Sequence, residues 1–439
     1  MIRRSWIGMV AAALLGMSPS AWSQQVLGPP QATPISNVVI QDIKAAKPAA
    51  PAAAAPVVNE APAGVCCKER CDGWGPTMPE NVGLFGPFLK RCDGTGGINV
   101  YGWLNGGYTY SSTGSGALAV QPRMNRFGNE FLANQLAIVF EKPLKSGEFN
   151  MGFNATFYAG ADPATIAPLG GFTTTNPRFG ADFRQLYVSA HLPILTEGGM
   201  DVKAGRMGSV IGWESALAPY RPFYSNDYQW FYAQDGAFTG VLTNLHVNNQ
   251  LDFINGVTFG ANTFFAQRGT GVCYLGQVNY WTSPEKRTML SASTYIGNQA
   301  LFAAGPGFIG DSDYMVEMRV QHSWNKCLTQ IIQSDLLWAS GVPGIGTTEY
   351  YTLYSIWTYH ATKRTDVNLR AELARDVQGS RTGVRTTYGE VTIGLDYHPT
   401  KSLRIRPEVR GDFSERPAFG PLGDRQRQLT IAVDAIWSF

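Results

Sequence analysis

The carboxyl-terminal part of the chain alternates apolar and polar residues, and this alternation limits the possible folds more than any other feature. In residues 402–413 (SLRIRPEVRGDF), Leu403 and Ile405 alternate with Arg404 and Arg406. Successive side chains of a β-strand point to opposite faces, so each such segment predicts a strand with one apolar and one polar side. The segments TDVNLRAELARD and YGEVTIGLDYHP repeat the pattern.

The connections between these segments alternate between short and long. From residue 97 to the end we count about sixteen segments, each near the roughly 9–11 residues with which a tilted strand crosses a bilayer. Short connections include EKPLKSG and HPTKS, whereas residues 111–129, 160–180 and 208–236 form long ones. This pattern predicts an all-β, up-and-down antiparallel transmembrane barrel over 97–439, with short periplasmic turns and long extracellular loops. The last segment, IAVDAIWSF, is expected to pair with the first and close the barrel.

A soluble two-sheet sandwich or a lipocalin-like barrel is the alternative fold. It would need an interior large enough for every apolar face, and it would place aromatic residues mid-strand. Here Trp, Tyr and Phe recur near the segment ends, which is typical of the aromatic girdles at membrane interfaces. Charged residues make up only 15% of the chain, against roughly 25% in soluble domains, which also favours the membrane barrel.

The first 23 residues have the features of a signal peptide. Arg3 and Arg4 precede an apolar run over 6–17, and Ala21-Trp22-Ser23 offers a small-residue cleavage site. A transmembrane anchor is the alternative, but this run is shorter than the roughly 20 residues that a spanning helix needs. We therefore expect export, with the mature protein in the bacterial outer membrane.

Two further regions precede the predicted barrel. Residues 24–63 are rich in Ala and Pro and predict a disordered periplasmic linker, and residues 64–96 form a Cys-rich segment. The disulfide candidates in this segment are Cys66, Cys67, Cys71 and Cys92. Their number in an exported chain favours disulfides, with the pairing open; a zinc site is the alternative, although paired CxxC motifs are missing. We expect no cofactor and no metal.

The chain resembles the OmpL-like β-barrel porin family of bacterial outer membranes. The resemblance follows the order of six blocks from about residue 98 to residue 439: INVYGWLNGGYTYSS, DFRQLYVSAHLP, VKAGRMGSVIGWESALAP, FYSNDYQWFYAQDGAFTGV, LRAELARDVQG and LRIRPEVRGDFS. It implies an outer-membrane barrel that passes solutes, and the family carries no catalytic residues to transfer. The block LRAELARD lacks the aromatic residue usual after the Glu, which we interpret as a lipid-facing difference.

The longest connection, 208–236, predicts a pore constriction. It is too apolar and aromatic for an exposed loop, and a loop of this length in an ordered protein is usually functional. Wall side chains cannot fill so wide a barrel, and a loop folded inward would narrow it. The charges expected at the constriction are Glu214, Arg221, Asp227 and Asp235. An extracellular lid is the alternative.

Charged residues are also expected to line the lumen wall. The candidates are Arg370, Glu372, Glu390, Asp396, Arg404, Arg406, Glu408 and Arg410. Rings of charge can set the ion preference of a pore. Because both signs are interleaved, a salt-bridged wall with little selectivity is an equal alternative.

The sequence favours a passive porin for small hydrophilic solutes. The balance of 35 Lys and Arg against 33 Asp and Glu argues against nucleic-acid binding. An outer-membrane enzyme would need a Ser/His pair at the lipid boundary, and no GxSxG-type motif accompanies the five histidines. A structural barrel that tethers the envelope to a periplasmic or cell-wall partner through its Cys-rich arm is the second alternative. Expected partners are outer-membrane lipid, small solutes and, by analogy with other barrels, two further copies in a trimer.

Overall fold

A computed structural model of the chain describes residues 97–117, 124–172, 175–234, 236–269, 272–298 and 312–439. The predicted signal peptide, linker and Cys-rich segment lie outside the described residues, as does Asp235. No helix in the described ranges is long and apolar enough to cross a membrane.

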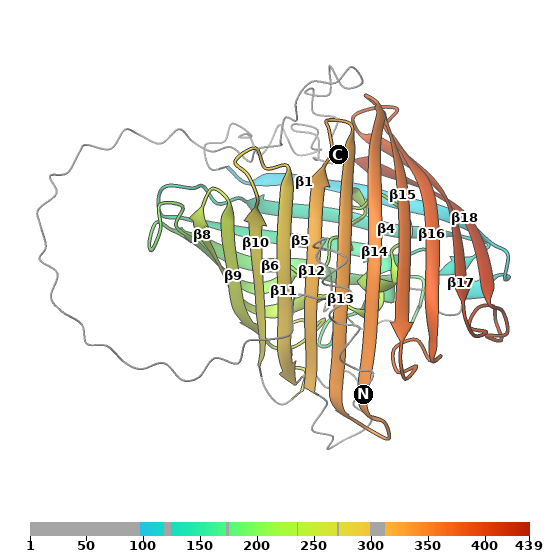
Figure 1. The fold of residues 1–439 in the computed structure, drawn as a ribbon. Helices are drawn as coiled ribbons and strands as arrows, with labels where there is room; N and C mark the ends of the chain where they lie inside the picture. The colour runs from blue at the N-terminus through green and yellow to red at the C-terminus, as the bar shows by residue number, and fades with distance from the viewer. Residues whose placement is uncertain (1–96, 118–123, 173–174, 235, 270–271, 299–311) are drawn as a thin grey trace, which may run out of the picture. The chain divides into compact units, whose positions relative to one another are not determined.

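Sixteen antiparallel strands form one closed barrel, in which each strand pairs with its neighbours in the sequence (Figure 1). The strands are β1 (Asn99–Ser111), β4 (Glu130–Lys142), β5 (Asn150–Gly160), β6 (Gly180–Leu192), β7 (Met200–Gly208), β8 (Ala237–Asn248), β9 (Leu251–Thr258), β10 (Cys273–Trp281), β11 (Thr288–Asn298), β12 (Ser312–Ser323), β13 (Leu328–Val342), β14 (Gly346–Thr362), β15 (Thr365–Asp376), β16 (Thr386–Tyr397), β17 (Leu403–Ser414) and β18 (Arg427–Ser438). The predicted fold class and strand number are confirmed.

Smaller elements lie in the long connections. The strands β2 (Gly116–Ala117) and β3 (Phe127–Gly128) pair as a separate two-stranded sheet between β1 and β4. Helix α2 (Ala161–Thr165) follows β5, and the 3-10 helix η3 (Ala218–Tyr220) and helix α3 (Tyr228–Tyr232) lie between β7 and β8.

The last strand closes the barrel against the first, as expected. The register runs from Trp103 opposite Ser438 to Ser111 opposite Thr430. Two backbone hydrogen bonds between Gly102 and Phe439, of 2.9 and 3.0 Å, extend this pairing to the last residue of the chain. A Cβ atom at Gly102 would lie 2.7 Å from the Phe439 ring, so glycine lets the terminal aromatic side chain pack on the first strand. An unpaired strand edge in hydrocarbon is too costly to persist, which explains why the carboxyl terminus does not fray.

Each strand has an exposed outer face and a covered inner face. In β18, Ile431 and Val433 are 48% and 41% exposed, whereas the inward-facing Thr430 and Asp434 are each 1% exposed. The exposed face is apolar and suits lipid, and the inner face is polar. Inward side chains lose their contact with solvent because the connection between β7 and β8 covers many of them.

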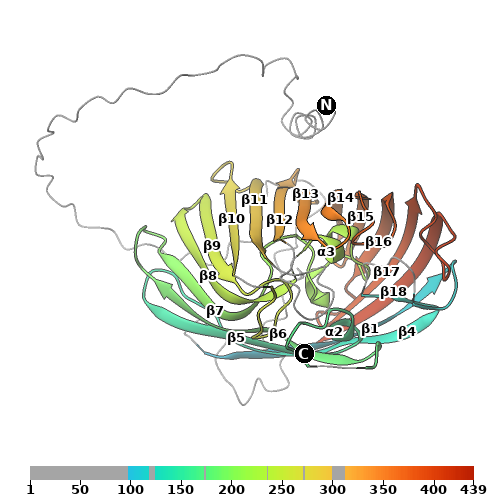
Figure 2. The same ribbon diagram turned by 90° about the horizontal axis from the view of Figure 1, so that it is seen from below.

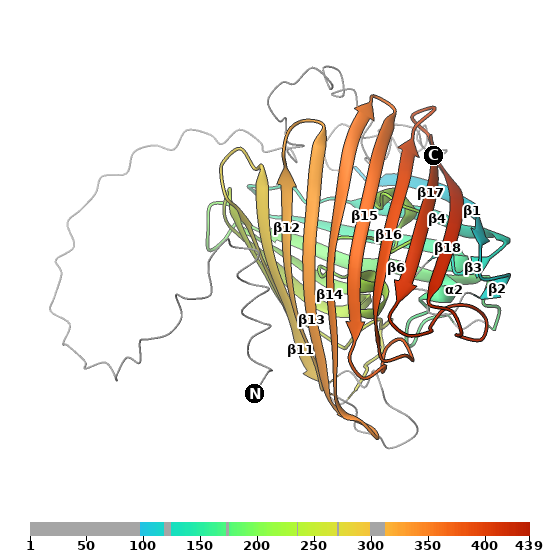
Figure 3. The ribbon, with the colours of Figure 1, turned by 45° about the vertical axis from the view of Figure 1, so that its right-hand side comes forward.

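The connections alternate in length as predicted, with one exception. The first residue of β1 and the last residue of β18 lie at the same end of the barrel as the short turns, such as the two residues between β8 and β9. The opposite end carries the long connections, except that only residues 343–345 join β13 and β14 (Figure 3). These two strands are the longest, with 15 and 17 residues, and they continue as a hairpin beyond their neighbours.

Candidate pore and inner loop

Residues 209–234, here called the inner loop, connect β7 to β8 and place α3 inside the ring of strands (Figure 2). The apolar side chains of the inner loop are buried, including Phe223 at 1%, Tyr224 at 0% and Tyr228 at 0% exposure. Phe223 packs with Ile331 and Tyr354 of the barrel wall. Burial of these rings explains the aromatic composition that the sequence shows in this connection.

Four inward arginines of β15 and β17 bind carbonyl oxygens of the inner loop. Arg406 donates to the carbonyls of Ala218 and Arg221 at 3.0 and 2.6 Å. The other three contacts are Arg404 to Pro219, Arg410 to Asn226 and Arg370 to Ser225. The guanidinium groups thus give charge-assisted hydrogen bonds to backbone carbonyls of η3 and of the segment that follows it, which are buried away from water.

Two inward carboxylates bind backbone N–H groups of the same segment. Glu408 accepts hydrogen bonds from Tyr224 at 2.9 Å and from Ser225 at 3.1 Å. Glu372 accepts from Tyr228 at 2.5 Å and from Gln229 at 2.7 Å, at the amino terminus of α3. The first N–H groups of a helix lack intrahelical partners, and a carboxylate there satisfies them and complements their partial positive charge.

Strand β4, which β18 and β1 separate from β17, holds the inner loop by side-chain amides. Gln135 donates to the carbonyl of Ala216 at 2.8 Å and accepts from the N–H of Ala218 at 3.1 Å. Asn134 accepts from the Tyr224 hydroxyl at 2.7 Å. Tyr224 of the inner loop is therefore bound by two strands. Its hydroxyl donates to Asn134 of β4, and its backbone N–H donates to Glu408 of β17.

A third contact lies at β12. Glu317 accepts a hydrogen bond from the N–H of Gly212, and Arg319 donates to the Gly212 carbonyl at 2.9 Å. Gln277 of β10 donates to the carbonyl of Val210 at 2.7 Å. The start of the inner loop is thus bound to the wall on this side as well.

Three of the four predicted constriction residues are described, and all three are buried. Glu214, Arg221 and Asp227 are 4%, 1% and 0% exposed. Glu214 pairs with Arg370 at 2.5 Å, and Arg221 lies 3.4 Å from Asp162 of α2. Their contacts are with the wall and with neighbouring loops, which is the geometry of anchors. A role for them in contact with a solute stays a prediction.

Asp227 caps α3 by accepting a hydrogen bond from the N–H of Trp230 at 2.6 Å. Burial raises the pKa of Asp227 well above its usual value, and the nearby carboxylates of Glu214 and Glu372 raise it further. This group therefore favours the neutral form, which lowers the cost of placing three carboxyl groups together.

The eight predicted wall residues all lie on the inner face and are at most 8% exposed. Most of their charge is paired within the wall. The ion pairs are Arg370 with Glu390, Arg404 with Asp396, Arg406 with Asp434 and Arg410 with Asp412. This arrangement matches the salt-bridged wall, the alternative that the interleaved charges left open. It does not by itself define an ion preference.

Asn134 and Gln135 of β4 are site residues that the sequence pattern does not predict. A β-bulge shifts the register between β1 and β4, so that Asn105 opposes Gln135 whereas Gly106 opposes Ala133. The extra residue turns two consecutive side chains inward, and strict alternation along the sequence carries no sign of it.

Four histidines face inward at the end with the short turns, and each bonds to an aspartate. His191 and His246 both contact Asp201, at 2.7 and 3.2 Å, and His246 also contacts Asp252 at 2.7 Å. His360 bonds to Asp366 at 2.8 Å, and His398 lies 3.1 Å from Asp396. His322 instead faces outward, against Trp324. The sequence did not indicate these aspartate partners.

A closed barrel of sixteen antiparallel strands with an apolar exterior, a polar interior and an inward-folded loop is characteristic of outer-membrane channel proteins. Residues 97–439 match the family described as "Putative beta-barrel porin-2, OmpL-like", and the chain belongs to this family. The resemblance seen in the sequence is confirmed, and the family and fold together place the barrel in the bacterial outer membrane.

Solved structures share the fold at low sequence identity. The outer membrane channel DcaP of Acinetobacter baumannii is 14% identical, with a TM-score of 0.53 over 80% of this chain and 99% of that chain. OmpF of Salmonella typhi, in a complex with daunomycin, is 12% identical, with a TM-score of 0.53 over 80% and 100%. An anion-selective porin from Comamonas acidovorans is 11% identical, with a TM-score of 0.50 over 78% and 99%. No curated protein sequence matches the chain significantly.

Proposed function

We propose that the protein lets small hydrophilic solutes diffuse passively through a water-filled pore narrowed by the inner loop. The observation that carries this proposal is the attachment of the inner loop to distant parts of the wall, through Gln135 of β4, Arg406 of β17 and Arg319 of β12. A loop held in this way occupies part of the lumen permanently, so the pore excludes solutes by size. Because Glu214, Arg221 and Asp227 are buried, their part in the constriction is to fix the position of the loop.

Swelling of liposomes in sugar solutions tests the proposed permeability. Vesicles that contain the folded protein are expected to swell quickly in a monosaccharide and slowly in a tetrasaccharide, because larger solutes are excluded by the narrowed lumen. Protein-free vesicles are the control for leakage. Swelling rates equal to those of protein-free vesicles in every sugar would contradict the proposal.

The amino-terminal predictions complete the proposal. Export through the signal peptide over residues 1–23 would bring Cys66, Cys67, Cys71 and Cys92 into an oxidising compartment, where disulfides form. Thiol labelling of the denatured mature protein, before and after reduction, measures this directly. Cys327 is disulfide-bonded, so it stays in place and only Cys273 is replaced by Ser. Labels gained on reduction then support disulfides that involve the amino-terminal cysteines, and no gain would contradict them.

A further inference from the structure

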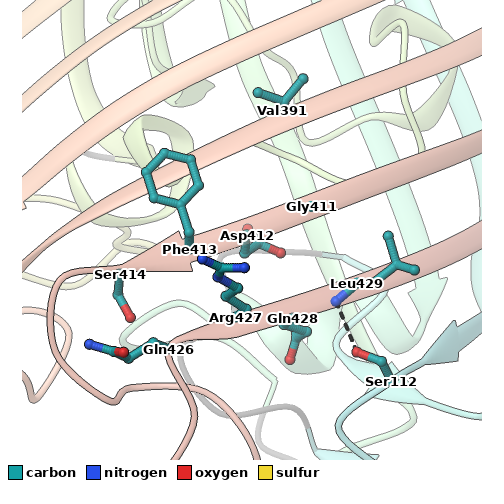
Figure 4. Close-up of a pocket in the computed structure, with 10 residues that line it drawn as sticks. All are labelled: Ser112, Val391, Gly411, Asp412, Phe413, Ser414, Gln426, Arg427, Gln428 and Leu429. Atoms are coloured by element: carbon teal, nitrogen blue, oxygen red, sulfur yellow. Dashed lines mark hydrogen bonds between the residues drawn. The ribbon is translucent and has the colours of Figure 1, made fainter.

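The outer face of the barrel carries a groove near the end with the long connections (Figure 4). Its lining includes Ser112, Val391, Gly411, Phe413, Arg427 and Leu429. Asp412 and Gln428 also line the groove, but they are the inward-facing residues between these outward-facing ones, so the groove opens on the face that contacts lipid.

The floor of the groove is Gly411. It lies in register between Val391 of β16 and Leu429 of β18, which are 49% and 43% exposed. A Cβ atom built on Gly411 would meet no atom within 4 Å. The absence of a side chain therefore leaves a notch one residue wide between two exposed apolar side chains.

Phe413 leaves this notch open. A Cβ atom on Gly389 of β16 would lie 1.9 Å from the Phe413 ring, so the ring lies across Gly389. Phe413 pairs with Gly389 on one side and with Arg427 on the other. The ring thus covers the neighbouring strand and does not cover Gly411.

Arg427 stands at the outer end of the notch and is exposed. Within the part of the chain that the structure describes, no carboxylate forms an ion pair with it. Glu415 pairs with Arg375 at 2.7 Å, and the inward Asp412 pairs with Arg410 at 2.8 Å. Arg425 lies close by and donates to the carbonyl of Ser112 at 3.0 Å.

We propose that this groove binds one phosphorylated, acylated glycolipid of the outer leaflet, with an acyl chain over Gly411 and a phosphate at Arg427. An apolar notch in the lipid-facing wall admits a hydrocarbon chain, and a guanidinium group binds phosphate through paired charge-assisted hydrogen bonds. A cation on an apolar surface without an anionic partner is costly near hydrocarbon, and a lipid phosphate supplies that partner. The long connections place this end of the barrel at the extracellular side, which selects the outer leaflet.

The occupant is a lipid rather than a second copy because of this charge. A second barrel would present another apolar outer face to Arg427, whereas a lipid presents an anion. The proposal rests on the membrane position of the barrel and does not depend on the pore, so its failure would leave conductance and sugar permeability unchanged.

Native mass spectrometry of the detergent-solubilised, folded protein with added lipid A tests the proposal. The wild-type barrel is expected to retain one lipid A, and to bind phosphatidylglycerol at least tenfold more weakly. Arg427→Gln and Gly411→Leu are each expected to weaken lipid A binding at least tenfold, by removing the phosphate partner and by filling the notch. Arg375→Gln and Ala371→Leu are matched changes on the same outer face and should stay within twofold of wild type.

Equal binding of lipid A by wild type, Arg427→Gln and Gly411→Leu would overturn the proposal, as would equal binding of phosphatidylglycerol. Cross-linking of two barrels through cysteines placed beside the notch, in the absence of lipid, would overturn it in favour of a contact between copies. Because Gly411→Leu is checked by heat-modifiable electrophoresis, a folding defect is recognised, and Arg427→Gln then decides the result alone.

Discussion

Arg406 illustrates how one buried side chain joins the wall to the inner loop. It pairs with Asp434 and donates to two carbonyls of the loop. We expect Arg406→Ala to lower the free energy of unfolding by about 3–5 kcal/mol, because Asp434 is left as an unpaired buried charge. Urea unfolding of the protein folded into lipid vesicles measures this. Arg375→Ala removes a pair on the outer surface and should cost no more than about 1 kcal/mol. Equal costs for the two variants would contradict the anchoring role.

Asp162 of α2 predicts a pH dependence of stability. Burial raises its pKa to about 6, although Arg221 and the amides of Asn134 and Gln135 oppose the shift. An unfolded aspartate has a pKa near 4, so the folded state holds the proton more tightly. The stabilisation from this group is complete below about pH 4 and is lost as the pH rises through about 6, a change of roughly 3 kcal/mol.

Urea unfolding at pH 4 and pH 7 checks this sign, with Asp162→Asn as the comparison. The wild type should lose more stability than the variant between the two pH values, because Asn does not titrate. If the free energy of unfolding of the wild type instead rose relative to that of the variant between pH 4 and pH 7, the raised pKa of Asp162 would be contradicted.

The strands depend on the contrast between the two faces. Leu369 of β15 faces outward and is 41% exposed, and it pairs with Trp357 and Ile393. Leu369→Arg is expected to cost about 2–4 kcal/mol, since a charge near the bilayer midplane contacts hydrocarbon. Thr358→Arg places the same side chain on the inner face of β14, where it is only partly buried, and should cost less than half as much. Unfolding in vesicles compares the two, and a smaller cost for Leu369→Arg would reverse the assigned faces.

The strands could be predicted from sequence because lipid on one side enforces a strict period of two. Leu403 and Arg404 show this period directly. The same alternation in the last segment, which ends at Phe439, predicted that this strand pairs with the first strand and closes the barrel. The connection at 343–345 departs from the expected alternation because β13 and β14 extend past the other strands as a hairpin. Hydrophobic patterning sets which face a residue occupies, and it does not set where a strand stops.

The candidate site was only partly predictable. The length and aromatic content of residues 208–236 indicated an inward loop, but the direction of Glu214 depends on Arg370, which is far away in the sequence. Asp227 instead bonds locally, as the cap of α3. The bulge at Asn134 adds a contact that no local pattern shows. Charged residues in a loop therefore predict polar contacts. They do not show whether a residue binds the loop to the wall or contacts a solute in the pore.

The whole molecule consists of a closed barrel wall and an inner loop that is hydrogen-bonded to this wall. Sixteen paired strands leave no free edge in the membrane, and the inner loop ties distant parts of that wall together through β4, β12, β15 and β17. Wall charges such as Arg370 and Glu390 neutralise each other, so we predict exclusion of solutes by size with weak selectivity for ions.

Single-channel conductance in planar lipid bilayers tests the central claim, that the inner loop narrows an open pore. The wild type should give stepwise openings, and replacement of residues 214–229 by a short Gly-Ser linker should raise the step size at least twofold. The wall charges released by this change become hydrated in the wider lumen, so the barrel itself should still fold, and heat-modifiable electrophoresis verifies this. Stepwise currents of the same size from the folded wild type and the folded variant, or no currents from either, would contradict the account.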